Sequence, residues 1–384
     1  MQVETLQYLP ETGWSKPVFP DLDSENTLIF LFCAPQFFKD PTQIKELSKH
    51  YPESKIIGCS TAGEIYGPTV SDNSISVAII KFEKTTIKLI ISTANDTTES
   101  FKAGEEIAQK LNGEKLAGIF VLSEGLKING SELVKGLNSI CRDQVVITGG
   151  LAGDGARFRE TQIIENGNFY SGKVVSVGFY GDHIQLGHGS KGGWDIFGVE
   201  RHITRSKNNI LYELDGKPAL ELYKEYLGDK STDLPASGLL FPLAIRKDAS
   251  DTKRLVRTIL GIDEKESALI FAGDMPQGYL AQLMRANFDR LITGATEAGK
   301  LVLESNGLLK ENTGPILIVA VSCVGRKLLL GERTEEETDS VLNIFPKDTK
   351  MVGFYSYGEL SPYAKGNCDL HNQTMTLTSF SERE

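Results

Sequence analysis

Cysteine and histidine are both scarce in this chain, with five of each among 384 residues. The cysteines are widely scattered, and none belongs to a C-x-x-C pair or to a paired histidine spacing typical of a zinc site. An odd, scattered set argues against a disulfide framework and favours reduced thiols in a cytoplasm. The sequence therefore gives no support to a disulfide-rich secreted domain or to a structural zinc.

Long hydrophobic runs and a basic excess are also missing. The apolar runs at 316–321 and 76–80 are far shorter than the roughly 20 residues of a membrane helix. The N-terminal segment has neither a basic start nor an apolar core, so it predicts no secretion signal. The net charge is −10, and no stripe of Lys and Arg interleaved with aromatic residues predicts a nucleic-acid surface. We expect a cytoplasmic protein whose partners include neither membrane nor nucleic acid.

What is present is an ordinary globular composition, 40% hydrophobic and 24% charged, long enough for two or three domains. One pattern occurs three times: a short continuous apolar run, a helical stretch, a second apolar run, and a turn of small residues. Continuous apolar runs of this length predict strands covered on both faces. The copies span 27–65, 118–154 and 315–359. The sequence predicts an α/β fold of mixed sheets, built from repeated strand-helix-strand-hairpin units in two domains.

Further elements are predicted within and between the three copies. The strands at 75–82 and 86–93 are close in sequence and predict a hairpin, as do those at 174–180 and 183–187. A helix is predicted at 279–298. The polar stretch 228–235 predicts a domain boundary and a hinge.

Three stretches together resemble the FIST family: GCSTAGEI at 58–65, ITRSKNNILYELDGKPALELYKEYLG at 203–228, and GFYSYGEL at 353–360 with HNQTMTLTSFSE at 371–382. The resemblance implies an N-terminal FIST domain at 1–228 with two repeats, and a C-terminal FIST domain at 229–384 with the third. The compact segment SPYAKGNCDL before HNQT departs from the family pattern.

The resemblance also implies an intracellular sensory protein that binds a small ligand such as an amino acid. A subset of the family binds haem, responds to nitric oxide, and regulates a histidine kinase or a cyclic-di-GMP enzyme. We therefore expect a sensor acting on such a partner, with haem as the specific version and a polar metabolite without haem as the alternative. A homo-oligomer is compatible with either version.

The turn GCSTAGE follows a buried strand, where open α/β sheets place their ligand sites. Backbone N–H groups and the hydroxyls of Ser60 and Thr61 could face a ligand there. The competing interpretation is that small residues only permit close packing. No Gly-Lys-Ser/Thr follows, so the turn is not a phosphate loop.

An acid follows a glycine at the same place in each repeat, namely Glu64, Asp154 and Glu359. These carboxylates could hold the ammonium group of an amino acid, and Arg157 could bind its carboxylate. Acids in glycine turns also commonly face solvent or bond their own backbone.

His188 is the first candidate for a haem-iron ligand, because it lies in the glycine-rich stretch GHGSKGGW with Trp194 and Phe197 nearby. His183 is the second. A structural histidine is the competing interpretation for both.

Catalytic patterns are absent: Ser60 does not fit G-x-S-x-G, and no serine or cysteine is paired with an evident base. We therefore expect a binding protein, not an enzyme. Cys59 with Glu64 remains the thiol-enzyme alternative, although a buried inert cysteine is the simpler interpretation.

Overall fold

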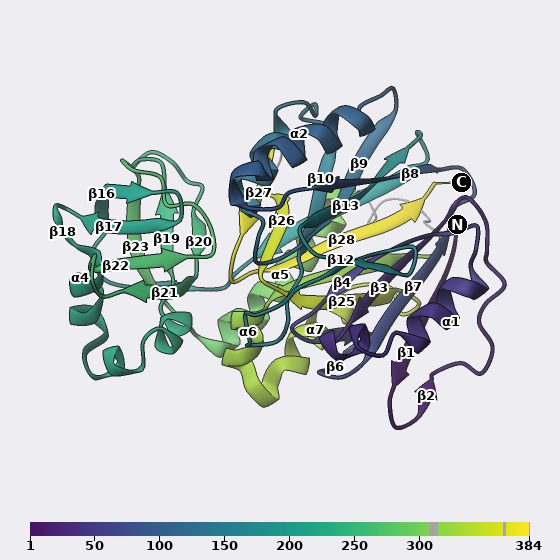
Figure 1. The fold of residues 1–384 in the computed structure, drawn as a ribbon, viewed down its shortest axis with the longest axis horizontal. Helices are drawn as coiled ribbons and strands as arrows, with labels where there is room; N and C mark the ends of the chain where they lie inside the picture. The colour runs from purple at the N-terminus through teal and green to yellow at the C-terminus, as the bar shows by residue number, and fades with distance from the viewer. Residues whose placement is uncertain (307–313, 364–365, 384) are drawn as a thin grey trace.

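The computed structural model describes residues 1–306, 314–363 and 366–383. It divides into a large body and a small domain at one end of it, and both termini lie at the far end of the body (Figure 1). Among the described residues, none of the helices combines the length and the apolar character that crossing a membrane requires.

Three sheets build the body. The first has the order β12-β11-β4-β3-β7-β1-β2 and consists of β1 (Gln2–Leu9), β2 (Gly13–Trp14), β3 (Thr27–Cys33), β4 (Lys55–Ser60), β7 (Ile75–Lys81), β11 (Ile163–Glu165) and β12 (Asn168–Tyr170). The second has the order β27-β26-β10-β9-β13-β8 and consists of β8 (Thr86–Thr93), β9 (Leu116–Ser123), β10 (Val146–Leu151), β13 (Lys173–Tyr180), β26 (Gly358–Pro362) and β27 (Cys368–His371). The third has the order β14-β28-β24-β25-β5-β6 and consists of β5 (Glu64–Tyr66), β6 (Thr69–Ser71), β14 (Ile184–Lys191), β24 (Leu317–Cys323), β25 (Lys350–Ser356) and β28 (Met375–Glu382).

Each sheet has the same plan, which confirms the predicted mixed α/β fold. A parallel pair from one repeat forms its centre: β3 with β4, β9 with β10, and β24 with β25. An antiparallel strand flanks each pair. The strand after each turn then crosses into another sheet, so that β5 joins β25, β11 joins β4 and β26 joins β10. The three repeats are therefore interlocked.

The two predicted hairpins are wrong. Strand β7 has β3 on one side and β1 on the other, so it has no free edge for β8, which pairs with β13 instead. Strand β13 lies between β9 and β8, and β14 therefore pairs with β28. Both corrections have one cause, since the nearest strand in sequence already has two partners.

Helices cover the outer faces of the sheets. They are η1 (Pro35–Phe38), α1 (Thr42–His50), η2 (Thr97–Glu99), α2 (Ser100–Leu111), α3 (Gly130–Asn138), α5 (Phe288–Asn306), α6 (Val324–Leu330), η5 (Gly331–Arg333) and α7 (Thr334–Leu342). The amphipathic helix α1, for example, buries Ile44 and Leu47 against the first sheet. The inner faces meet around Phe30, Phe120 and Phe380, whose ring centroids lie 5.0 to 6.1 Å apart. These three rings are at most 1% exposed, so the central core excludes water.

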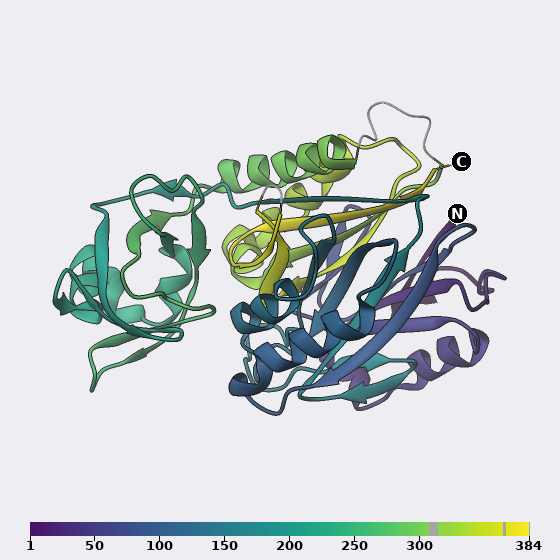
Figure 2. The same cartoon turned by 90° about the horizontal axis from the view of Figure 1, so that it is seen from above.

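The small domain is an insertion between β14 and α5. It contains β15 (Asp195–Ile196), β16 (Arg201–Lys207), β17 (Ile210–Leu214), β18 (Lys217–Pro218), α4 (Ala219–Leu227), η3 (Gly228–Asp233), η4 (Ala236–Leu240), β19 (Leu243–Arg246), β20 (Leu255–Arg257), β21 (Ile259–Asp263), β22 (Ala268–Phe271) and β23 (Leu280–Arg285). Its own apolar core contains Leu211, Tyr223 and Phe271. The chain leaves the body after β14 and returns to it at α5, which extends from the small domain along the body (Figure 2).

Two sequence predictions within this insertion are wrong, namely the position of the hinge and the start of the helix. The polar stretch 228–235 forms η3 and the two residues before η4 inside the small domain, whereas the chain passes between the two bodies after β14 and before α5, so this stretch is not the connection between them. Residues 279–285 are largely β23, because Leu283 and Ala281 are buried there and pair with β19. The helix begins only at Phe288.

Candidate functional site

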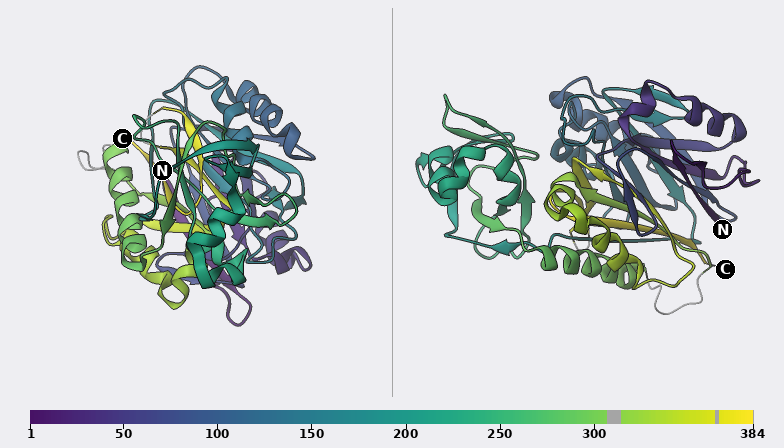
Figure 3. Two further views of the ribbon diagram at one scale, coloured as in Figure 1. Left: turned by 90° about the vertical axis from the view of Figure 1, so that its left-hand side faces the viewer. Right: turned by 90° about the horizontal axis from the view of Figure 1, so that it is seen from below.

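The three turns that follow β4, β10 and β25 meet at one end of the body. Backbone hydrogen bonds join them: Ala62 N–H donates to Tyr355 O (2.8 Å), Gly153 N–H to Ser60 O (3.0 Å), and Tyr357 N–H to Leu151 O (3.2 Å). The small domain stands in front of this end of the body when the molecule is seen along its length (Figure 3). The candidate site is therefore built where the turns, β27 and the small domain come together.

Glu64 is held inside the body. Its carboxylate accepts hydrogen bonds from the Thr61 hydroxyl and from the backbone N and Oγ of Ser74, both at 2.9 Å. The side chain is 1% exposed, and burial raises its pKa to about 7, although these donors pull in the opposite direction. The backbone of Gly63, just before it, has φ +136°, which favours glycine.

Glu359 has the same arrangement in the third repeat. Its carboxylate accepts from Ser356 Oγ (2.8 Å), from Thr374 N (3.1 Å) and from Thr374 Oγ1 (2.9 Å). The side chain is fully buried, and burial raises its pKa to about 8. The repeat relationship therefore extends to side-chain chemistry, and both acids are engaged by internal donors.

Asp154 differs from its two counterparts. Its carboxylate accepts from the backbone N–H groups of residues 158–160 and from the Tyr357 hydroxyl. Tyr357 in turn stacks on Phe158, with ring centroids 4.4 Å apart. Arg157 is exposed, and its Nε donates to the carbonyl of Asp154. Asp154 thus orients Tyr357 and the loop that follows it.

The remaining residues of the first turn are buried. Ser60 Oγ accepts from Gln162 N–H (3.0 Å), and the Thr61 hydroxyl lies between Cys33 O and Glu64. Cys59 is fully buried, and burial raises the pKa of its thiol well above its usual value. A buried, neutral thiol is a poor nucleophile, so this geometry does not favour the thiol-enzyme alternative. The ligand roles predicted for Ser60 and Thr61 stay predictions.

Two cavities lie between the body and the small domain. The larger, about 360 Å³, is bounded by Ser131 and Lys135 of α3, Asp369 of β27, and Lys253 and Arg257 of the small domain. The smaller, about 130 Å³, is bounded by Tyr357, Phe158 and the turn between β16 and β17. We call the larger one the interdomain pocket. Of the predicted ligand residues none borders it, and only Asp154 approaches the smaller one, through Tyr357.

Polar contacts close the interdomain pocket around its rim. Asp274 of the small domain accepts from Asn129 Nδ2 (2.9 Å) and Lys135 Nζ (3.1 Å) of the body. Lys253 Nζ pairs with Asp369 at 2.5 Å. Such partly exposed ion pairs contribute little to stability, about 0–1 kcal/mol each. They can therefore break and re-form at small cost when the domains move.

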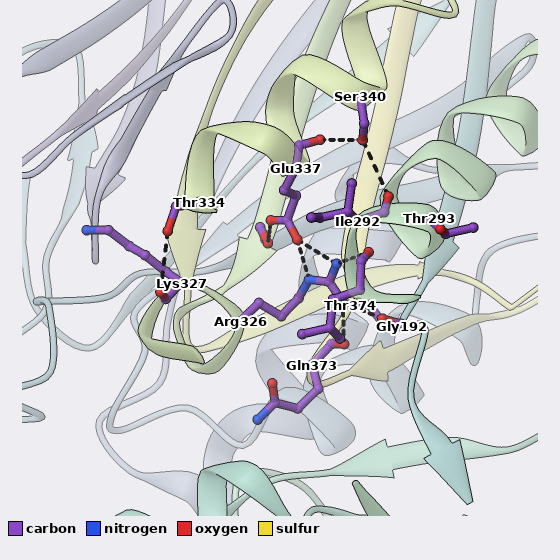
Figure 4. Close-up of polar contacts among 12 residues, drawn as sticks. Gly192, Ile292, Thr293, Arg326, Lys327, Thr334, Glu337, Ser340, Gln373 and Thr374 are labelled. Carbon is purple, nitrogen blue, oxygen red and sulfur yellow. Dashed lines mark hydrogen bonds and ion pairs between the residues drawn. The ribbon is translucent and has the colours of Figure 1, made fainter. Parts of the chain in front are cut away.

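Both crossings between body and small domain are fixed by one arginine. Arg326 of α6 is fully buried, and its guanidinium pairs with Glu337 of α7, with Nη2 at 2.5 Å from the carboxylate (Figure 4). It also donates to Gly192 O, on the outgoing crossing, and to Leu291 O (2.8 Å), on the returning helix α5. Trp194 Nε1 bonds Gln373 O (2.9 Å) close by. The crossings are thus anchored firmly to the body, whereas the pocket rim is not.

The two candidate histidines lie at a different place. His188 is on β14 beside a pocket of about 600 Å³ bounded by Leu301, Glu304 and Tyr363. Its Nδ1 is buried without a hydrogen-bond partner among the described residues, and burial lowers its pKa, so the ring is neutral at pH 7. His183 directly precedes β14. A neutral, unpartnered imidazole fits an iron ligand, but among the described residues that border this pocket there is no Arg or Lys to pair with haem propionates.

No group of three or more His, Cys, Asp or Glu side chains in the described part of the chain could hold a metal ion. Sequence reasoning missed the interdomain pocket. The available signals were the turn GDMPQG, which holds Asp274, the segment NCDL, which holds Asp369, and Arg257 within residues 254–260, whose pattern predicts a strand.

Models of two protein-family domains match most of the chain. The model of the FIST N domain matches residues 27–217, and that of the FIST C domain matches residues 219–362. An uncharacterized protein of Methanocaldococcus jannaschii is 24% identical over 371 residues, which cover 85% of this chain and 67% of that protein. The crystal structure of a cyanuric acid hydrolase from A. caulinodans aligns with a TM-score of 0.35 and 8% identity, over 93% of this chain and 90% of the other. That structural similarity is too low to carry an argument about function.

Proposed function

Because the chain belongs to the FIST family, whose domains are sensory and generally linked to signalling, we propose that it senses a small polar molecule bound in the interdomain pocket. The observation that carries this proposal is the 360 Å³ pocket formed jointly by α3, β27 and the small domain. Its size lies in the range of small-molecule sites, and such sites occur preferentially between domains.

The signal in this proposal is a change in the position of the small domain. A ligand shifts a conformational equilibrium only if it binds the two states unequally. A molecule that contacts both walls of the pocket binds the closed state better, because only that state offers both walls. The anchored crossings at Gly192 and Leu291 would act as the pivot. The partner would be a cytoplasmic signalling protein such as a histidine kinase or a cyclic-di-GMP enzyme.

Tryptophan fluorescence can test this proposal, because the chain has two tryptophans and one of them, Trp194, lies at the outgoing crossing. In a Trp14→Phe variant, Trp194 is the sole reporter. Amino acids, dicarboxylates and sugar phosphates are added one at a time. At least one of these compounds should change the emission of Trp194 saturably. The matched control is Ser131→Leu, which places a larger side chain in the pocket and should abolish that change. A response that survives Ser131→Leu would contradict the proposal.

A second candidate function is haem binding through His188, favoured by the buried, unpartnered Nδ1 beside a large pocket. Bound haem would supply an iron site for a gas such as nitric oxide. Titration of the protein with haem should give a Soret band in the wild type that is lost or shifted in His188→Ala. His183→Ala is the matched control. A featureless titration would eliminate this candidate without affecting the interdomain pocket.

A further inference from the structure

Arg257 is a buried cation at the wall of the interdomain pocket. It ends β20 in the small domain, and its side chain is only 4% exposed. Its Nε donates to Asp274 O (3.0 Å), and its Nη1 donates to Val256 O (3.1 Å) and to Leu370 O (3.0 Å) of the body. All three acceptors are neutral carbonyls.

The guanidinium of Arg257 therefore has N–H donors that no described residue uses. Arginine has five N–H donors, and the two on Nη2 have no acceptor among the described residues. No described carboxylate lies within 4.0 Å of the Arg257 guanidinium. The nearby acids have other partners, because Asp274 pairs with Lys135 and Asp369 pairs with Lys253. Burial lowers the pKa of Arg257 to about 10, with these two acids pulling the other way, so the side chain remains cationic at neutral pH. A buried charge without a counter-ion is costly.

The pocket around Arg257 shares this positive excess. Of the described residues that line it, five are cationic and three are acidic. Planar guanidinium groups bind carboxylates and phosphates through paired N–H donors. Resting on the proposed function, we propose that the interdomain pocket selects a small anionic metabolite, whose carboxylate or phosphate occupies the free Nη2 side of Arg257.

An anion at this position would also affect how the small domain is held against the body. Arg257 already bridges the small domain, through Asp274, and the body, through Leu370. An anion bound at its Nη2 supplies the missing counter-charge at that bridge, which strengthens the contact of the two bodies. A neutral ligand would leave the charge uncompensated.

Thermal unfolding with paired probes tests the anion requirement. Succinate and glycerol 1-phosphate are compared with their neutral counterparts succinamide and glycerol, at constant ionic strength set with chloride. A ligand that binds only the folded state raises Tm. We expect at least one anion to raise the Tm of the wild type more than its neutral counterpart, and the stronger anion identifies carboxylate or phosphate as the recognised group.

Variants decide whether Arg257 is responsible. Arg257→Gln should lose the anion-specific rise, and the exposed Arg142→Gln should keep it. If Arg257→Gln does not fold, Lys253→Gln replaces it, because Lys253 is 38% exposed, lines the same pocket and should weaken the anion preference. Neutral compounds that bind as well as the anions, or a preference unchanged in the variants, would overturn the inference and leave the proposed function standing. No Tm rise with any of the four probes would overturn this inference, whereas the proposed function is tested separately by the fluorescence of Trp194 and its response to Ser131→Leu.

Discussion

The buried carboxyl of Glu359 makes the free energy of unfolding depend on pH. Burial raises the pKa of its carboxyl from 4.5 to about 8 in the folded protein. Between these values the folded state binds a proton that the unfolded state has released. The slope of the unfolding free energy against pH is therefore negative there, so this stabilisation is fully present below pH 4.5 and is lost as the pH rises towards 8.

The size of the effect follows from the shift. One pKa unit corresponds to about 1.4 kcal/mol, so three pH units, from 5 to 8, correspond to about 4 kcal/mol. Glu359→Gln removes the titration. We expect the difference in unfolding free energy between wild type and Glu359→Gln to move by up to about 4 kcal/mol over that range, with the wild type losing stability relative to the variant.

Urea unfolding followed by circular dichroism at pH 5, 6, 7 and 8 measures this difference. The control is Glu336→Gln, because Arg333 lowers the pKa of the exposed Glu336. Its contribution is lost only as the pH falls through that lowered pKa, so its difference from the wild type should be constant from pH 5 to 8. A constant difference for Glu359→Gln as well would refute the reasoning.

Three further predictions concern the body. Glu337→Ala leaves the buried Arg326 without a counter-ion and should lower the free energy of unfolding in urea by about 3–5 kcal/mol. The double variant Arg326→Met/Glu337→Leu should recover much of this loss. A loss below about 1 kcal/mol in Glu337→Ala would contradict the buried pair. Phe380→Ala empties the centre where the three sheets meet and should cost about 3–5 kcal/mol in the same assay, and a cost below about 1 kcal/mol would contradict that packing. In a thiol titration of the native protein only Cys141 should react, and slowly, because the other four cysteines are buried and partial burial raises its pKa to about 11; reaction of two or more thiols would contradict this.

The sequence allowed the repeat and its turns to be predicted, because both depend on local signals. Continuous apolar runs mark β3, β9 and β24, and a glycine before Glu64, Asp154 and Glu359 marks the turns. Sequence alone could not say that strands leave their own repeat. The partner of β8 is β13, far along the chain, and the pairing follows from which sheet edges remain open.

The interdomain pocket was harder to predict for a related reason. Arg257 lies in a stretch that predicts a strand, where an arginine usually points to solvent. Its burial results from Leu370 and Asp274, which come from two other segments. By contrast, the predicted acids Glu64 and Glu359 were found together at the turns but are bonded internally. The chemistry of the pocket is thus a property of the tertiary fold.

Hydrogen exchange measured by mass spectrometry, with and without a small-molecule extract of the host cell, tests the central claim most directly. We expect slower exchange in α3, β20, residues 273–279 and β27, which contribute residues to the interdomain pocket. Unchanged exchange in all four segments, or protection confined to β14 and α5 beside His188, would contradict it.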